Sequence, residues 1–182
     1  MRPTLFPCLA LPSRRRGAWL ALGLAALAAA GCANIEQVEP GTPLAQVQGR
    51  FGAPTHACPL PDGGQRLVWS QQPYGQYAWG TRTTADGRVG PVEPILTDEY
   101  FKRLDQGHWT AERILCEFGP PAVIERVGMP SVRQVVWAYR YRENHVWNSL
   151  MHLYMGPDGT RLTRRHAAPD PMFEMNDSNS YD

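Results

Sequence analysis

Few residues in this chain are spaced in a way that could support covalent chemistry. Cys58 and Cys116 could join as a disulfide or stay two separate thiols, because the sequence does not say whether their Cα atoms lie within about 7 Å of each other. The histidines show no i,i+4 pairing and no Cys-x-x-Cys companion, so we interpret them as surface or packed side chains and predict no metal site. They stand at positions 56, 108, 145, 152 and 166.

The sequence also lacks the arrangements that mark common active sites. It has no Gly-x-Ser-x-Gly, no His-Glu-x-x-His and no glycine-rich phosphate loop. Catalysis needs a nucleophile or an acid–base pair held in one place, and no such pair is recognisable. We therefore predict that the protein is not an enzyme and that it binds no non-covalent cofactor.

Aromatic side chains are better candidates for function, because Trp and Tyr are enriched where proteins bind one another. The chain has six Trp and seven Tyr. Trp69 and Trp137 recur at matching places in a repeat and are predicted to be core residues. Tyr74 and Tyr77 stand beside Pro and Gly in a loop-like stretch, so we expect them to be exposed. Trp109, at a helix start, fits either location, and it joins the two tyrosines as a possible partner-binding residue.

The chain contains an internal repeat. Residues 39–54 and 105–121 each have a Gly at their third position, continue through an amphipathic stretch and end in Phe-Gly-x-Pro. Further along, Val68-Trp69 matches Val136-Trp137, and an Asp-Gly pair follows in both copies. The offset between matching positions rises from 66 to 72, which indicates small insertions in loops.

Each repeat predicts a helix followed by three antiparallel strands. Leu44, Val47 and Phe51 lie three or four residues apart, as do Ile114 and Phe118, so each segment can form a helix with one apolar stripe. The following Gly ends the helix. Strands are expected where β-branched and aromatic residues gather, with an Asp-Gly turn before the last one. The predicted strands cover residues 65–71, 76–84 and 88–92, and then 133–142, 145–155 and 160–166.

The repeat divides the chain into a first unit, residues 39–93, and a second unit, residues 94–168. The second unit gains an extra helix, residues 98–104, with Thr97 as its N-cap. Residues 32–38 are expected to be a membrane-proximal spacer. Residues 169–182 show no periodicity and are expected to be disordered.

The repeats resemble the BamE (SmpA/OmlA) domain. The resemblance rests on Gly-x-x-x-x-x-Val-x-x-x-Phe-Gly-x-Pro at residues 41–54, on the tryptophan strand after it and on the strand that ends in Asp-Gly. The second copy, from Leu96 through Asp158-Gly159, is closer still. Members of this family are outer-membrane lipoproteins and belong to the machine that inserts β-barrel proteins. The resemblance implies an α+β fold of two tandem units, each with one or two helices packed on a three-stranded antiparallel sheet.

Two alternative functions are implied by the resemblances of this chain to known proteins. Membership of the BamE family implies a factor that binds barrel-assembly or other envelope proteins and supports assembly or maintenance of outer-membrane β-barrel proteins. Typical members carry one such domain, whereas this chain carries two. A tandem pair also resembles, in architecture, the β-lactamase inhibitory protein, whose two repeats form a concave sheet surface over an enzyme. That resemblance implies the alternative, an inhibitor or regulator of a periplasmic enzyme.

Residues 1–31 have the pattern of a signal peptide, with three arginines at 14–16 before an uncharged run that is too short to span a bilayer as a helix. Its end, Ala29-Ala30-Gly31-Cys32, resembles the lipobox of bacterial lipoproteins. The resemblance implies cleavage before Cys32 and attachment of a diacylglycerol and a fatty acid there. The alternative is cleavage after Ala30, which leaves Cys32 an incidental thiol.

The lipobox resemblance also implies a location. Sorting in that family depends on the residues after the Cys, where Asp signals inner-membrane retention, and here Ala33 and Asn34 follow. We therefore expect an anchor in the inner leaflet of the outer membrane, with the protein facing the periplasm, where disulfides can form. Without residues 1–31 the chain has 14 basic and 17 acidic residues, a net charge of −3, so we predict no nucleic-acid partner.

Overall fold

The computed structural model describes residues 34–177, which form an α+β structure with two four-stranded antiparallel sheets. Sheet 1 has the order β1-β2-β3-β4 and sheet 2 the order β5-β6-β7-β8. The expectation of three strands per unit is therefore wrong by one strand in each sheet. The strands of sheet 1 are β1 (His56–Pro59), β2 (Gln65–Ser70), β3 (Ala78–Arg82) and β4 (Glu93–Pro94). Those of sheet 2 are β5 (Val123–Val127), β6 (Gln134–Glu143), β7 (Trp147–Tyr154) and β8 (Arg164–Pro169).

The strands that the sequence analysis missed are β1 and β5, which follow the two helix stops directly. β1 is short and ends in a proline, and such a segment is tolerated at a sheet edge because one side of the strand needs no hydrogen bonds. β5 is also an edge strand, paired with β6 from Val123↔Ala138 to Val127↔Gln134. Four of its five residues are exposed, so it lacks the half-buried alternation by which a strand is recognised.

The last strand of each unit begins later than predicted. After the Asp-Gly turns, Arg88 and Arg161 each form only an isolated bridge, to Pro43 and Thr110 respectively. Pro43 and Thr110 are the N-caps of the two matching helices, so this contact is itself part of the repeat.

The predicted helices are present. α2 (Leu44–Phe51) and α4 (Ala111–Phe118) each have eight residues and end at a Gly with positive φ. α3 (Asp98–Phe101) continues as the 3-10 helix η2 (Lys102–Asp105), and the side chain of Thr97 accepts a hydrogen bond from the backbone N of Tyr100, which confirms the predicted cap. No helix within residues 34–177 is long and apolar enough to cross a membrane. The remaining short helices are η1 (Ile35–Gln37), η3 (Pro130–Val132) and α5 (Pro171–Asp177).

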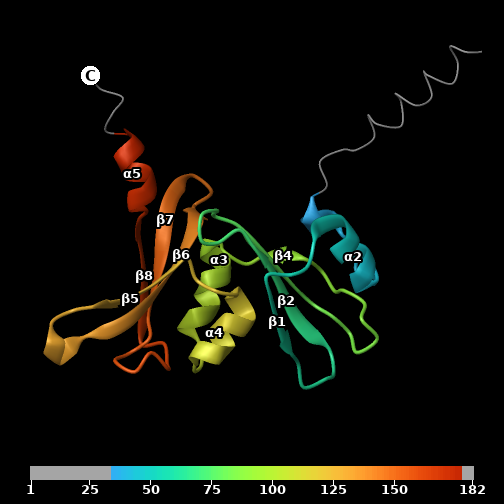
Figure 1. Ribbon diagram of the computed structural model, residues 1–182, viewed down its shortest axis with the longest axis horizontal. Coiled ribbons are helices and arrows are strands. Elements are labelled where there is room, and N and C mark those ends of the chain that lie inside the picture. Colours follow the sequence, from blue (N-terminus) through green and yellow to red (C-terminus); the bar gives the residue numbers. More distant parts are fainter. Residues whose placement is uncertain (1–33, 178–182) are drawn as a thin grey trace, which may run out of the picture. The chain divides into compact units, whose positions relative to one another are not determined.

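The core has two parts, which lie on opposite faces of sheet 1. On one face Val47 of α2 packs with Leu67 and Trp69 of β2. On the other face Val68 belongs to a larger cluster that also holds α3, α4 and the inner face of sheet 2. Figure 1 shows α3 and α4 between the two sheets, with α2 beyond sheet 1. The helices α3 and α4 of the second unit therefore pack against both sheets.

Two segments outside the repeats differ from expectation. The predicted membrane-proximal spacer, residues 32–38, packs on the fold in its described part, since Ile35 is buried in the cluster with Val47 of α2. The tail that is expected to be disordered from residue 169 instead begins with the end of β8 and with α5. Asp170 is fully buried, and its Oδ2 lies 2.8 Å from Nε of Arg140. This ion pair anchors the start of the tail on sheet 2.

Candidate functional site

A disulfide joins Cys58 of β1 to Cys116 of α4, and their Cα atoms lie 5.7 Å apart. The sequence left this pairing open, because one cysteine lies in a proline-rich stretch and the other in a helix. The bond ties the edge of sheet 1 to a helix that also packs on sheet 2. Its position explains why the two cysteines stand at non-equivalent places in the repeat.

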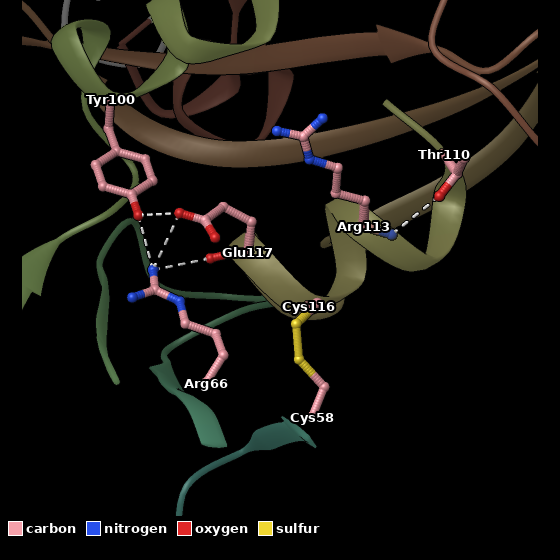
Figure 2. The surroundings of a disulfide bond; sticks show 7 residues. All are labelled: Cys58, Arg66, Tyr100, Thr110, Arg113, Cys116 and Glu117. Carbon is pink, nitrogen blue, oxygen red and sulfur yellow. Dashed lines mark hydrogen bonds and ion pairs between the residues drawn. A yellow bond between two sulfur atoms is a disulfide. The ribbon is translucent and has the colours of Figure 1, made fainter. Parts of the chain in front are cut away.

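A buried polar cluster lies beside the disulfide. Nη2 of Arg66 donates to the hydroxyl of Tyr100 at 2.8 Å and to the backbone O of Glu117 at 3.2 Å. The Tyr100 hydroxyl in turn donates to Oε1 of Glu117. Figure 2 shows these three side chains directed toward one another from β2, α3 and α4. The cluster therefore connects sheet 1 with both helices by polar contacts inside the larger core.

The surroundings of this cluster are specific. A Cβ at Gly80 would meet the guanidinium of Arg66, so a larger residue at this position would force that side chain to shift. Burial raises the pKa of Tyr100, the charge of Arg66 opposes this, and the hydrogen bond to Glu117 adds to the rise. The phenol consequently stays a neutral donor at physiological pH, as its hydrogen bond to the carboxylate requires.

The tyrosines predicted to be exposed are exposed. Tyr74 is 76% and Tyr77 is 47% accessible, in the loop between β2 and β3. The loop is attached to sheet 2 by Gln72. The side-chain amide of Gln72 accepts a hydrogen bond from the backbone N of Arg140 and donates one to the backbone O of Arg140. Arg140 lies in the part of β6 that extends beyond its pairing with β5. These contacts satisfy the free backbone N–H and C=O groups at the edge of β6, and they fix the position of the loop that carries the two tyrosines.

Trp109, which fitted either location, is a core residue. It is 5% accessible, lies 6.2 Å from the ring of Phe118 and donates from Nε1 to the backbone O of Arg103 and of Gln106. Little of its ring is accessible, so Trp109 does not belong to an exposed aromatic surface. Trp69 and Trp137 are also buried, as predicted.

Trp147 is an exposed residue that the sequence pattern did not predict. It is 66% accessible at the start of β7, next to the exposed Val146. Both line a hollow of about 510 Å³, together with Phe173 of α5. Gln76, from the loop that carries the two tyrosines, donates a hydrogen bond to Asn148, the neighbour of Trp147. The signal that could have found it is the turn at residues 144–146, which places Trp147 at a hairpin end.

Cys32, the predicted lipid attachment site, lies outside the described residues. Among residues 34–177, His, Cys, Asp and Glu form no group of three that could hold a metal ion. Comparison of the chain with protein-family models, with curated proteins and with solved structures found no match.

Proposed function

We propose that the protein is a lipid-anchored factor at the outer membrane that faces the periplasm, is built of two tandem BamE-like units and binds other envelope proteins. In this proposal it supports assembly or maintenance of outer-membrane β-barrel proteins, as a binding protein and not as an enzyme. The anchor is Cys32. Two or more acyl chains hold a protein stably on a bilayer, whereas one chain binds only marginally.

The observation that carries the proposal is a set of exposed aromatic side chains, which we call the aromatic surface: Tyr74, Tyr77 and Trp147. These come from both units, and the hydrogen bond between Gln76 and Asn148 connects the segments that carry them. Tyr and Trp bury much area for little loss of side-chain entropy, and they dominate binding energy at protein interfaces. A surface that needs both units also gives the tandem arrangement a purpose.

The test is a mild-detergent pull-down of the full-length protein from its own cell envelope, with bound proteins identified by mass spectrometry. Cys32→Ala tests the anchor, and a Tyr74→Ala, Trp147→Ala double variant tests the aromatic surface. Met129→Ala is the matched control, because Met129 is equally exposed but lies on the β5–β6 connection.

We expect barrel-assembly components with the wild type and with Met129→Ala, and their loss with the other two variants. Recovery of a periplasmic hydrolase in their place would favour the alternative, an enzyme inhibitor. Equal recovery with all four proteins would show that the aromatic surface is not the binding site.

A further inference from the structure

An arginine-lined hollow of about 470 Å³ lies next to the disulfide, and its lining comes from sheet 1 and from the segment that holds η2 and α4. Its lining includes four arginines, one carboxylate and one indole ring: Arg66, Arg82, Arg103, Arg113, Glu117 and Trp109. Four guanidinium groups face one lining carboxylate, and a second carboxylate, Glu93, lies 3.8 Å from Arg103, so an excess of positive charge remains in a chain that is otherwise mildly acidic after residue 31.

Two of these arginines are placed at a cost in stability. Arg66 of β2 pairs directly with Arg82 of β3, and like charges opposite each other on one sheet face are destabilising. Arg66 is also 2% accessible, and within residues 34–177 its Nε has no hydrogen-bond partner. Its nearest carboxylate, Glu117 at 3.6 Å, is shared with Arg103 at 3.4 Å. The fold thus keeps a buried guanidinium that the protein only partly satisfies.

The other two arginines are held in fixed orientations by aromatic rings. The guanidinium carbon of Arg103 lies 3.9 Å from the ring centre of Tyr100, and that of Arg113 lies 3.8 Å from the ring centre of Trp109. Nη1 of Arg113 also donates to the backbone O of His108. Stacking of this kind fixes the guanidinium plane, which lowers the entropy lost when its remaining N–H groups bind an anion.

We propose that this hollow binds a phosphate monoester carried on a small water-soluble molecule. A phosphate monoester carries nearly two negative charges at neutral pH and several strong acceptor oxygens, which suit guanidinium groups arranged around one space. The charge excess favours such a dianion over a single carboxylate. The hollow has room for the organic part as well, and Trp109 and the aliphatic Leu60 supply apolar lining for it. This site is separate from the aromatic surface and does not depend on it.

The test is isothermal titration calorimetry on the full-length protein in mild detergent at constant ionic strength, with glycerol 3-phosphate, inorganic phosphate and acetate as probes. Arg82→Gln removes one charge from the lining. Arg82 is exposed, and its side chain makes no hydrogen bond or ion pair inside residues 34–177, so this variant is expected to fold. Arg133→Gln is the matched control, since Arg133 is exposed and does not line the hollow.

We expect saturable binding of glycerol 3-phosphate that Arg82→Gln weakens by about tenfold or more, which is the usual effect of losing a charge-assisted hydrogen bond. Arg133→Gln should bind like the wild type, inorganic phosphate should bind less tightly, and acetate should not compete. The absence of binding at millimolar concentration, an equal loss in both variants, or competition by acetate as strong as that by glycerol 3-phosphate would each overturn the proposal.

Discussion

Helix α2 packs on one face of sheet 1, whereas its counterpart α4 packs between sheet 1 and sheet 2. Phe51 of α2 is half-buried, but the matching Phe118 is fully buried, 5.4 Å from the ring of Phe101 and 6.0 Å from that of Tyr139. Both helix ends are fixed in a similar way, since the backbone O of Gly52 accepts from Trp69 and that of Gly119 accepts from Tyr139. The same sequence pattern therefore makes the same local structure, while the second copy also supplies the shared core.

The second tryptophan of each repeat has a different position in the two sheets, because the two hairpins have different turns. In sheet 1 Trp69 pairs directly with Trp79. In sheet 2 the turn is tight, with Asn144 and His145 at positive φ, so Trp137 pairs with Leu153 and Trp147 moves to the end of the hairpin. An equal spacing of ten residues thus places the second tryptophan inside one sheet and at the exposed end of the other.

The largest expected effect concerns the two matching phenylalanines. Phe118→Ala should lower the free energy of unfolding by about 3 to 5 kcal/mol, because it leaves a cavity in the shared core. Phe51→Ala should cost about 1 to 2 kcal/mol, since less of its ring is buried. Urea unfolding of both variants measures the difference. Equal losses would contradict the view that α4 carries more of the fold than α2.

The disulfide provides the next test, because it ties β1 to α4 while the matching edge strand β5 has no such bond among the described residues. The Cys58→Ser, Cys116→Ser double variant should lose about 2 to 4 kcal/mol, since the bond closes a long loop in the unfolded chain. Because a looser unfolded chain lowers the stability of the whole fold, hydrogen exchange should rise in both edge strands, but more in β1, which also loses its link to α4, than in β5. Reduction of the wild type is the control and should give the same pattern, whereas a uniform rise in both strands would show that the bond does not act locally.

Much of each unit could be predicted from local pattern. The helix over Leu44–Phe51, the Thr97 cap and the exposure of Tyr74 all depend on nearest neighbours in the sequence, and these predictions are confirmed. Features that depend on contacts between the units were missed. The Arg66 cluster unites β2, α3 and α4, and Trp109 belongs to the core cluster that holds side chains of both sheets.

Alanine substitutions at the two glycines that end α2 and α4 distinguish the cost of the backbone conformation from the cost of packing. Gly52 and Gly119 have φ values of 81° and 74° with extended ψ values of 175° and −173°, a backbone conformation that essentially only glycine adopts, so alanine at either position should cost about 1 to 3 kcal/mol. A Cβ at Gly52 meets nothing within 4 Å, but at Gly119 it would lie 3.0 Å from Cγ1 of Val68. Gly119→Ala should therefore lower the free energy of unfolding by about 1 kcal/mol more than Gly52→Ala, as measured by thermal or urea unfolding. The same loss in both variants would mean that Val68 moves aside without cost.

The smallest expected effect is a pH dependence that comes from sheet 2. His152 of β7 and His166 of β8 are cross-strand partners whose rings stack with centres 5.1 Å apart. Partial burial, and then the charge of His166, lower the pKa of His152 below its usual value, while Glu125 opposes them. The folded protein thus binds fewer protons than the unfolded chain just below the usual histidine pKa of about 6.5. Stability is full above that pH and decreases as the pH falls from there toward the lowered pKa.

His152→Gln should remove the part of the acid-induced loss of stability that comes from His152. The measurement is the difference between the free energies of unfolding at about pH 8 and at about pH 5. The substitution His108→Gln, at an exposed residue that precedes α4, is the control and should leave the pH dependence of the wild type in place. If His152→Gln and the wild type lose the same free energy between the two pH values, the histidine pair does not couple protonation to folding. The acid sensitivity would then have to come from another part of the molecule.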